Sequence, residues 1–202
     1  LEEFRAVFAN KLCLLEERPS GKGWEHTALT NDAKDVLNTA DLLEKIYKDN
    51  KHQVDQSSLL KVRLFDMVVN DWDRHEDQWV WVAHSQKGKT VYSAFARDRD
   101  QSFSKTDGFI LYFISRPWVL RSLQHMSPTV KDVIGSNMAA KSLDRQFLNA
   151  LNQQEWERII TELQTELTDT VIESSVNLMQ KESNAISGGH LIGRLKSRRD
   201  HM

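Results

Sequence analysis

Residues 70–79 read Asn-Asp-Trp-Asp-Arg-His-Glu-Asp-Gln-Trp and form the densest polar run of a 202-residue chain. Most of these side chains can take part in acid–base, metal or hydrogen-bond chemistry. The run follows an apolar segment and precedes a second one, so its polar groups are anchored at both ends. A short polar loop held in this way is typical of a catalytic loop.

The two flanks of this run differ in their periodicity. Residues 55–69 are predicted to form a helix that is apolar nearly all round, which is typical of a buried helix. After the run, Trp79 and Trp81 alternate with Val80 and Val82 at strand spacing. Residues 85–88 are turn-forming and residues 91–95 are strand-like, so we expect a β-hairpin after the buried helix.

The rest of the chain is predicted to be helical, which makes the fold mainly α with a small β-hairpin. Residues 31–202 are interpreted as one mainly helical domain, and residues 1–30 as a strand and hinge segment. The expected helices cover 31–48 with a break near Thr39, a segment starting at the N-cap Ser115, residues 144–152, a segment through 156–167, one capped by Thr168 or Asp169, and a short one after Gly188-Gly189.

A second acidic run begins where the hairpin ends, at Arg97-Asp98-Arg99-Asp100. Because a hairpin returns the chain to its starting point, we expect Asp98 to approach Asp73. Converging carboxylates repel unless a cation lies between them, and oxygen ligands suit Mg²⁺ or Mn²⁺. On a strand, the alternation would place Asp98 and Asp100 on one face and both arginines on the other.

These two runs resemble the catalytic loops of atypical kinases. Asp73-Arg74-His75 with the amide Gln78 is similar to the Asp-Arg-His-x-x-Asn loop of phosphoinositide kinases, and HipA-like, CotH-type and secretory-pathway kinases have similar loops. Asp98 followed by Phe103 resembles the metal-binding motifs of the last two groups. The resemblance implies the C-terminal lobe of an atypical kinase-like α+β fold.

The same resemblance implies a role for each residue. Asp73 would be the catalytic base, with Arg74 and His75 shaping the loop. Asp98 would be the main metal ligand, and Gln78 and Asp100 further ligands. Supporting positions around them would be Asp77, Arg97 and Arg99. The implied cofactors are ATP and Mg²⁺ or Mn²⁺.

The sequence also departs from the kinase pattern. The family has Asn where this chain has Gln78, whose longer side chain would shift the metal. A Gly-rich phosphate loop is missing, because Ser20-Gly21-Lys22-Gly23 is too short and generic. We therefore expect the nucleotide-covering lobe to lie upstream, with residues 1–30 as its remnant, or to be absent.

A longer but less informative resemblance is to a domain of Bacteroidetes envelope proteins that also carry a calcineurin-like phosphoesterase and an outer-membrane barrel. It rests on short segments of this chain, among them 16–19, 63–67, 71–79, 97–103, 115–118 and 143–145. It implies a periplasmic or envelope location and further domains of the same polypeptide. The single cysteine, Cys13, does not decide the compartment.

Charge and hydropathy narrow the set of partners. The formal net charge is −2, and basic residues cluster near the C-terminus alone, at Arg194, Lys196, Arg198 and Arg199. We interpret that cluster as a solvated helix end, so nucleic acid is not an expected partner. The sequence has no apolar run of about 20 residues, so we expect no membrane insertion by this segment.

Three functions fit these observations. The first is a metal- and nucleotide-dependent phosphotransferase lobe whose acceptor is unknown. The second is a catalytically inactive kinase-like scaffold or binding module of a larger envelope protein, which Gln78 and the missing phosphate loop favour. The third is a metal-dependent phosphoesterase, because converging carboxylates serve that chemistry too.

Overall fold

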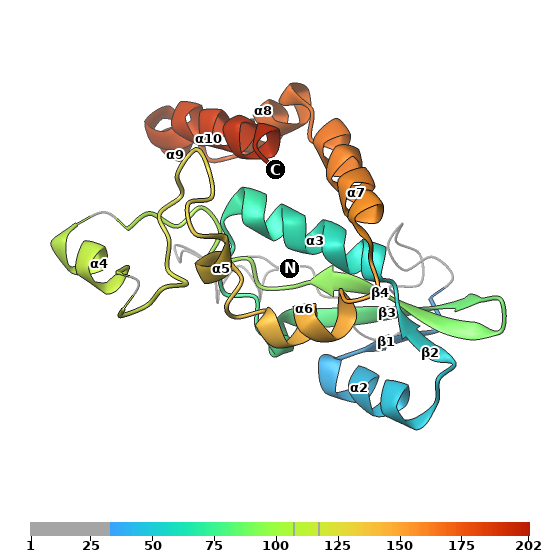
Figure 1. Ribbon diagram of the computed structural model, residues 1–202. Helices are drawn as coiled ribbons and strands as arrows, with labels where there is room; N and C mark the ends of the chain where they lie inside the picture. The colour runs from blue at the N-terminus through green and yellow to red at the C-terminus, as the bar shows by residue number, and fades with distance from the viewer. Residues whose placement is uncertain (1–32, 107, 117) are drawn as a thin grey trace, which may run out of the picture.

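The computed structural model describes residues 33–106, 108–116 and 118–202 (Figure 1). These residues form an α+β fold of helices and one small mixed sheet. The expected mainly helical chain with a hairpin is therefore confirmed at this coarse level, and the sheet has two more strands than expected. The predicted strand and hinge within residues 1–30, and Cys13, lie outside the described residues.

The β-hairpin forms the middle of the sheet, whose strand order is β1-β3-β4-β2. Strands β3 (Trp79–Gln86) and β4 (Lys89–Ala96) pair antiparallel. Lys87 and Gly88 both have positive φ, 49° and 81°. A two-residue turn with this backbone matches the twist of the strands it joins. The short edge strands are β1 (Asp35–Leu37), antiparallel to β3, and β2 (His52–Val54), parallel to β4.

The first helices frame this sheet. Of the helix expected over residues 31–48 with a break near Thr39, the part after the break is confirmed as α2 (Thr39–Lys48), with Asn38 as its N-cap. The part before the break was wrong, because residues 35–37 form a strand that pairs with β3. The buried helix is confirmed as α3 (Gln56–Val69), with Asp55 as its N-cap. Asn70 ends α3 in the left-handed region, at φ 61°, and this turns the chain into the polar run.

The later helices are mostly where the sequence predicts them. Helix α7 is confirmed with a capping box, Thr168 caps α8, and α10 follows Gly188. Two predictions were wrong. Ser115 ends α4 rather than starting a helix, and the helix from 144 stops at Phe147, since Asn152 already caps α7. The bounds are α4 Phe109–Ile114, α5 Val133–Ser136, α6 Lys141–Phe147, α7 Gln153–Glu166, α8 Asp169–Asn177, α9 Lys181–Ser183, a π-helical turn Asn184–Gly188 and α10 Gly189–Asp200.

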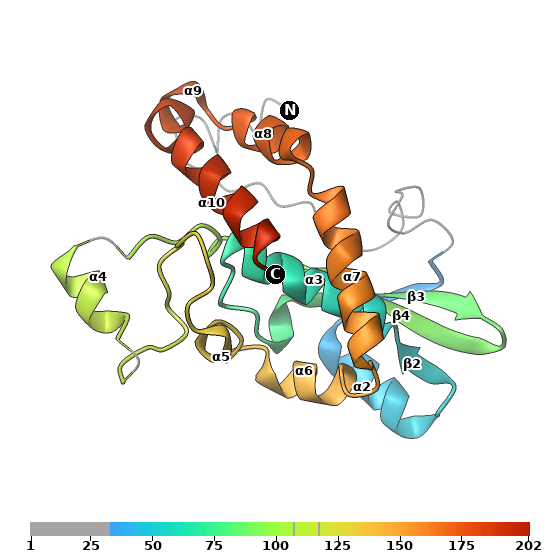
Figure 2. The same cartoon turned by 45° about the horizontal axis from the view of Figure 1, so that its top comes forward.

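Helix α3 lies between the sheet on one side and α7, α8 and α10 on the other (Figures 1 and 2). It contributes to all three hydrophobic clusters. Leu59 packs with Trp79 and Trp81 of the sheet, and all three side chains are buried. The opposite faces of α3 contact α7 and the α8–α10 pair. Within the described residues, none of the helices is long and apolar enough to cross a bilayer.

Candidate functional site

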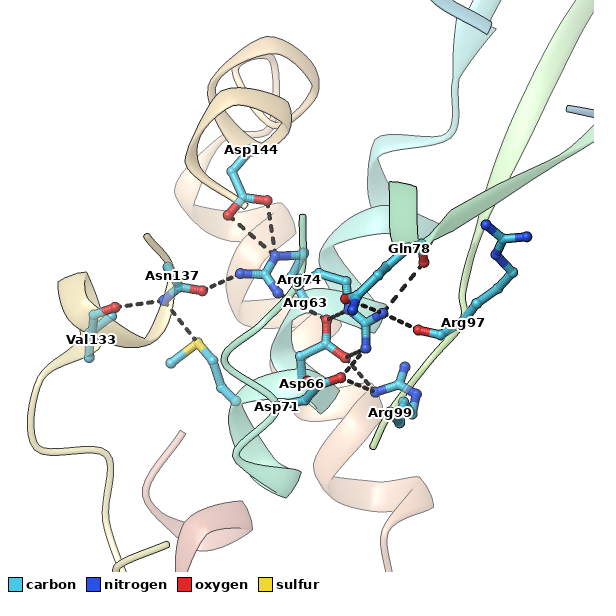
Figure 3. A network of polar contacts seen from close by, with 11 residues as sticks. Arg63, Asp66, Asp71, Arg74, Gln78, Arg97, Arg99, Val133, Asn137 and Asp144 are labelled. Atoms are coloured by element: carbon cyan, nitrogen blue, oxygen red, sulfur yellow. Dashed lines mark hydrogen bonds and ion pairs between the residues drawn. The ribbon is translucent and has the colours of Figure 1, made fainter. Parts of the chain in front are cut away.

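A carboxylate that lies inside α3 organises the polar part of the molecule. Asp66 is 1% exposed and accepts hydrogen bonds from three arginines (Figure 3). Arg63 Nη1 is 2.9 Å and Arg74 Nε 3.1 Å from Oδ2, and Arg99 Nη1 contacts Oδ1. A buried charge of this kind is stable only when it is paired and hydrogen-bonded. Asp66 therefore joins the helix to both polar runs.

Arg74 is the residue that connects the two runs. It is 1% exposed, and its Nη2 contacts Asp71 Oδ2 while its Nη1 donates to the carbonyl of Arg97. The backbones also meet, since Arg97 N–H donates to Gln78 O at 2.9 Å. The guanidinium lies 5.5 Å from the ring centroid of Trp79, within cation–π range. The two runs are thus brought together at the open end of the hairpin, as the sequence predicts.

Asp71 has an unusual electrostatic environment. Burial raises the pKa of its carboxyl from 3.8 to about 6, against the opposing pull of Arg74. Its Oδ1 is buried without a hydrogen-bond partner among the described residues. Arg99 adds a longer contact to Oδ2, at 3.9 Å. Protonation of Asp71 near pH 6 would change the charge of this cluster.

The far end of the network continues away from the two runs. Arg63 Nε donates to Asp144 of α6 at 3.0 and 3.3 Å, and its Nη2 donates to Asn137. Burial raises the pKa of Asp144, and Arg63 opposes that shift. Counting charges, three arginines (63, 74 and 99) face three carboxylates (66, 71 and 144). The network is therefore electrically balanced without a ligand.

The predicted catalytic residues Asp73, Arg74 and His75 differ from one another in burial and in polar contacts. Asp73 is half-buried and makes no hydrogen bond or ion pair within the described residues, and His75 is exposed. Arg74 pairs with Asp66 and Asp71, because it reaches back toward α3, where buried carboxylates need a cation.

The three predicted metal ligands differ in their burial. Gln78 is buried, and its Oε1 accepts from Arg74 Nη1 at 3.4 Å. Asp98 is half-buried and Asp100 exposed. The alternation argument for Asp98 and Asp100 was wrong, because β4 ends at Ala96 and Asp98 has φ 53°. Within the described ranges, there is no group of three or more His, Cys, Asp or Glu side chains that could hold a metal ion.

The supporting residues have structural contacts. Arg97 Nη2 donates to the carbonyl of the exposed Asp77 at 2.6 Å. Arg99 contacts Asp66 and stacks over Phe65, with 5.0 Å to the ring centroid. Both arginines thus fasten the second run, one to the first run and the other to α3.

The residue that sequence reasoning missed is Asp66, together with its partner Arg63. Both fall in a helix that otherwise reads as apolar on every side, where an unpaired charge would be prohibitively costly. Their spacing of three residues places them on one face of the helix, and Arg63 Nη1 does bond Asp66. A charged pair inside an apolar helix is the signal that identifies a buried network.

Comparisons of the chain with models of protein families, with curated proteins and with solved structures found no match. The predicted metal ligands Gln78, Asp98 and Asp100 carry side-chain oxygens, the type of donor that Mg²⁺ or Mn²⁺ prefers. The network of buried ion pairs around Asp66 holds in place the two polar runs that carry these residues.

Proposed function

We propose that this chain is a kinase-like phosphotransferase lobe in which Asp73 is the base and Asp98 the principal metal ligand. The observation that carries the proposal is the backbone of Asp98, which has φ 53° without being glycine. That conformation costs an L-residue roughly 1 kcal/mol or more. Strained residues of this kind cluster at functional sites, where the surrounding structure holds them.

The surroundings of Asp98 provide such a hold. Its neighbour Arg97 is fixed through its N–H to Gln78 and through its carbonyl to Arg74. On the other side, Arg99 is fixed on Asp66. With both neighbours anchored, the backbone of Asp98 is held in place, as a residue that carries a metal ligand requires.

The order of elements supports the same proposal. A buried helix leads into a loop with Asp73, a hairpin follows, and the chain returns to Asp98 beside that loop. Asp73 makes no hydrogen bond or ion pair with the described residues, so its carboxylate is available to accept the proton of an attacking hydroxyl. A divalent ion held by Asp98, with Gln78 or Asp100, would neutralise phosphate charge. The acceptor molecule is not identified.

Calorimetric titration of ATP with Mg²⁺ or Mn²⁺ tests the proposal. Asn tolerates the left-handed region, so Asp98→Asn removes the charge and keeps the backbone. Asp77→Asn is the matched control, since it neutralises an exposed carboxylate of the adjacent loop. We expect metal-dependent binding to wild type and Asp77→Asn, and at least tenfold weaker binding to Asp98→Asn. Equal binding to all three proteins would overturn the metal role of Asp98.

The second candidate is a catalytically inactive binding module with a kinase-like site. Two observations favour it: the network is charge-balanced, and the Gln78 amide oxygen is already engaged by Arg74. This candidate expects no nucleotide binding in the presence or absence of metal. It also expects Asp98→Asn to leave the binding properties of the protein unchanged.

A further inference from the structure

A large cavity in the described part of the chain lies on the other side of α3 from the sheet. Its volume is about 760 Å³, within the range of small-molecule sites. Helices α3, α6, α7 and α10 and the segment 129–137 line it, and both α7 and α10 pack on α3 (Figure 2). Most of the lining is apolar, with Leu64, Met67, Val68, Trp156 and Ile160 as examples.

A buried cation lies in the wall of this cavity. Arg198 of α10 is 3% exposed, although the basic cluster containing it reads as a solvated helix end. That interpretation was wrong for Arg198, and its neighbours Lys196 and Arg199 are paired with acidic residues of α8. Arg198 forms no ion pair with a carboxylate among the described residues.

The contacts of Arg198 leave hydrogen-bonding capacity unused. Nη1 is 3.0 Å from both Met67 O and Asn70 Oδ1 and 3.3 Å from Met126 Sδ. Nε is buried and has no acceptor within the described residues. Buried guanidinium groups are normally paired, because removing the charge from water is costly. An anion is the missing partner that this environment calls for.

The remaining charges of the cavity wall also favour an anionic ligand. Arg63 and Arg145 line it with Arg198, and Asp144 is the single carboxylate among the described lining residues. Asp144 is engaged by Arg63. The lining therefore has an excess of positive charge and a mostly apolar surface.

We infer that this cavity binds a single-chain amphiphile whose carboxylate pairs with Arg198 and whose apolar tail lies against α3 and α7. The apolar lining supplies the contact for the tail through hydrophobic burial. The unpaired guanidinium selects the head group through a charge-assisted hydrogen bond. The inference does not depend on the proposed phosphotransferase function, because neither Asp73 nor Asp98 lines the cavity.

A comparison of three head groups on the wild-type protein tests the inference without any variant. Decanoate, decan-1-ol and decylammonium have the same tail, and each is titrated calorimetrically. We expect decanoate to bind roughly tenfold or more tightly than decan-1-ol, because only it gains a hydrogen bond between two charged groups. Decylammonium should bind most weakly. Equal affinity for the three, or absence of decanoate binding, would overturn the inference.

Variants then locate the site. Arg198→Met should remove the preference for decanoate over decan-1-ol, whereas the matched control Arg145→Met, in an exposed arginine of the same wall, should retain most of it. Ile160→Trp fills the cavity and should abolish binding of all three probes without touching Arg198. A brominated decanoate should quench fluorescence in wild type by contact with Trp156, and Trp156→Phe should lose that component. Unchanged selectivity in Arg198→Met would rule out its role.

Discussion

Arg74 and Arg198 are both almost fully buried, yet they differ in what surrounds them. Arg74 lies against Asp66 and Asp71 in a balanced network, whereas Arg198 has backbone, amide and sulfur acceptors and no carboxylate within the described residues. Both contact α3, Arg74 through Asp66 and Arg198 through the carbonyl of Met67. A compensated buried charge organises structure, and an uncompensated one leaves interaction energy available for a ligand.

The largest loss of stability should follow from removing the Asp66 carboxylate, which lies at the centre of the balanced network that contains Arg74. Asp66→Asn leaves Arg63, Arg74 and Arg99 without their shared anion. Breaking a buried ion pair by removing one partner typically costs 3–5 kcal/mol, and we expect about that loss in the free energy of unfolding. Urea denaturation followed by circular dichroism measures it.

Asp169→Asn is the control for this prediction. Asp169 also contacts two cations, Lys196 and Arg199, but its side chain is 58% exposed. Solvent screening limits such pairs, so we expect Asp169→Asn to lose far less stability than Asp66→Asn. If both variants lost the same stability, the central role of Asp66 would be wrong.

The second test asks whether burial or the contact with Arg74 has the larger effect on the pKa of Asp71. Its pKa of about 6 lies above the unfolded value of 3.8, so the neutral form is favoured by folding. The associated stability is fully present below pH 3.8 and is lost as the pH rises through 6, by an amount on the order of 3 kcal/mol. The unfolding free energy of wild type minus that of Asp71→Asn should therefore fall between pH 4 and pH 7.

Urea titrations of both proteins at several pH values provide this difference, in which the contributions of other titrating groups cancel. A difference that rises with pH would mean that the contact with Arg74 outweighs burial and lowers the pKa instead. Carbon-detected NMR titration of the Asp71 carboxyl gives the pKa directly and separates the two cases.

The third test asks whether the backbone of Asp98, next to the balanced network, is strained. Asp98 has φ 53°, whereas Asp100 is not among the residues with positive φ. Asp98→Gly should therefore be more stable than Asp98→Ala by about 1 kcal/mol. At Asp100 the order should reverse, since glycine has the larger conformational entropy when unfolded. Thermal and urea denaturation of the four variants tests this, and the same order at both positions would contradict it.

The compensated site could be predicted from the sequence only in part. Local patterns predict α3, the β3–β4 hairpin and the Thr168 cap, because periodicity and capping are properties of neighbouring residues. The same logic brings the runs at 70–79 and 97–103 together. The edge strands β1 and β2 have three residues each, too few for a periodic signal, and their pairing depends on the hairpin.

Partners that are distant in sequence explain the remaining misses. Asp66 bonds Arg99, which lies 33 residues away, and Arg198 bonds Asn70 across 128 residues. In sequence, Arg198 is surrounded by basic residues and reads as solvated, and only the packing of α10 on α3 buries it. The sequence predicts Asp98 as a metal ligand. It does not predict the left-handed backbone of this residue, because that conformation depends on the contacts of Arg97 and Arg99.

The smallest effect is expected at the uncompensated site. Arg198→Met removes bonds to Met67 O and Asn70 Oδ1, and it also removes a cation whose burial lowers its pKa to about 10. These two terms oppose each other, so the unfolding free energy should change by less than about 1 kcal/mol, against about 3–5 kcal/mol lost in Arg74→Met. Parallel urea denaturation of the two variants measures the contrast. Equal losses would show that Arg198 stabilises the end of α3 as strongly as Arg74 stabilises the network, and they would remove the energetic reason for an anion to bind beside it.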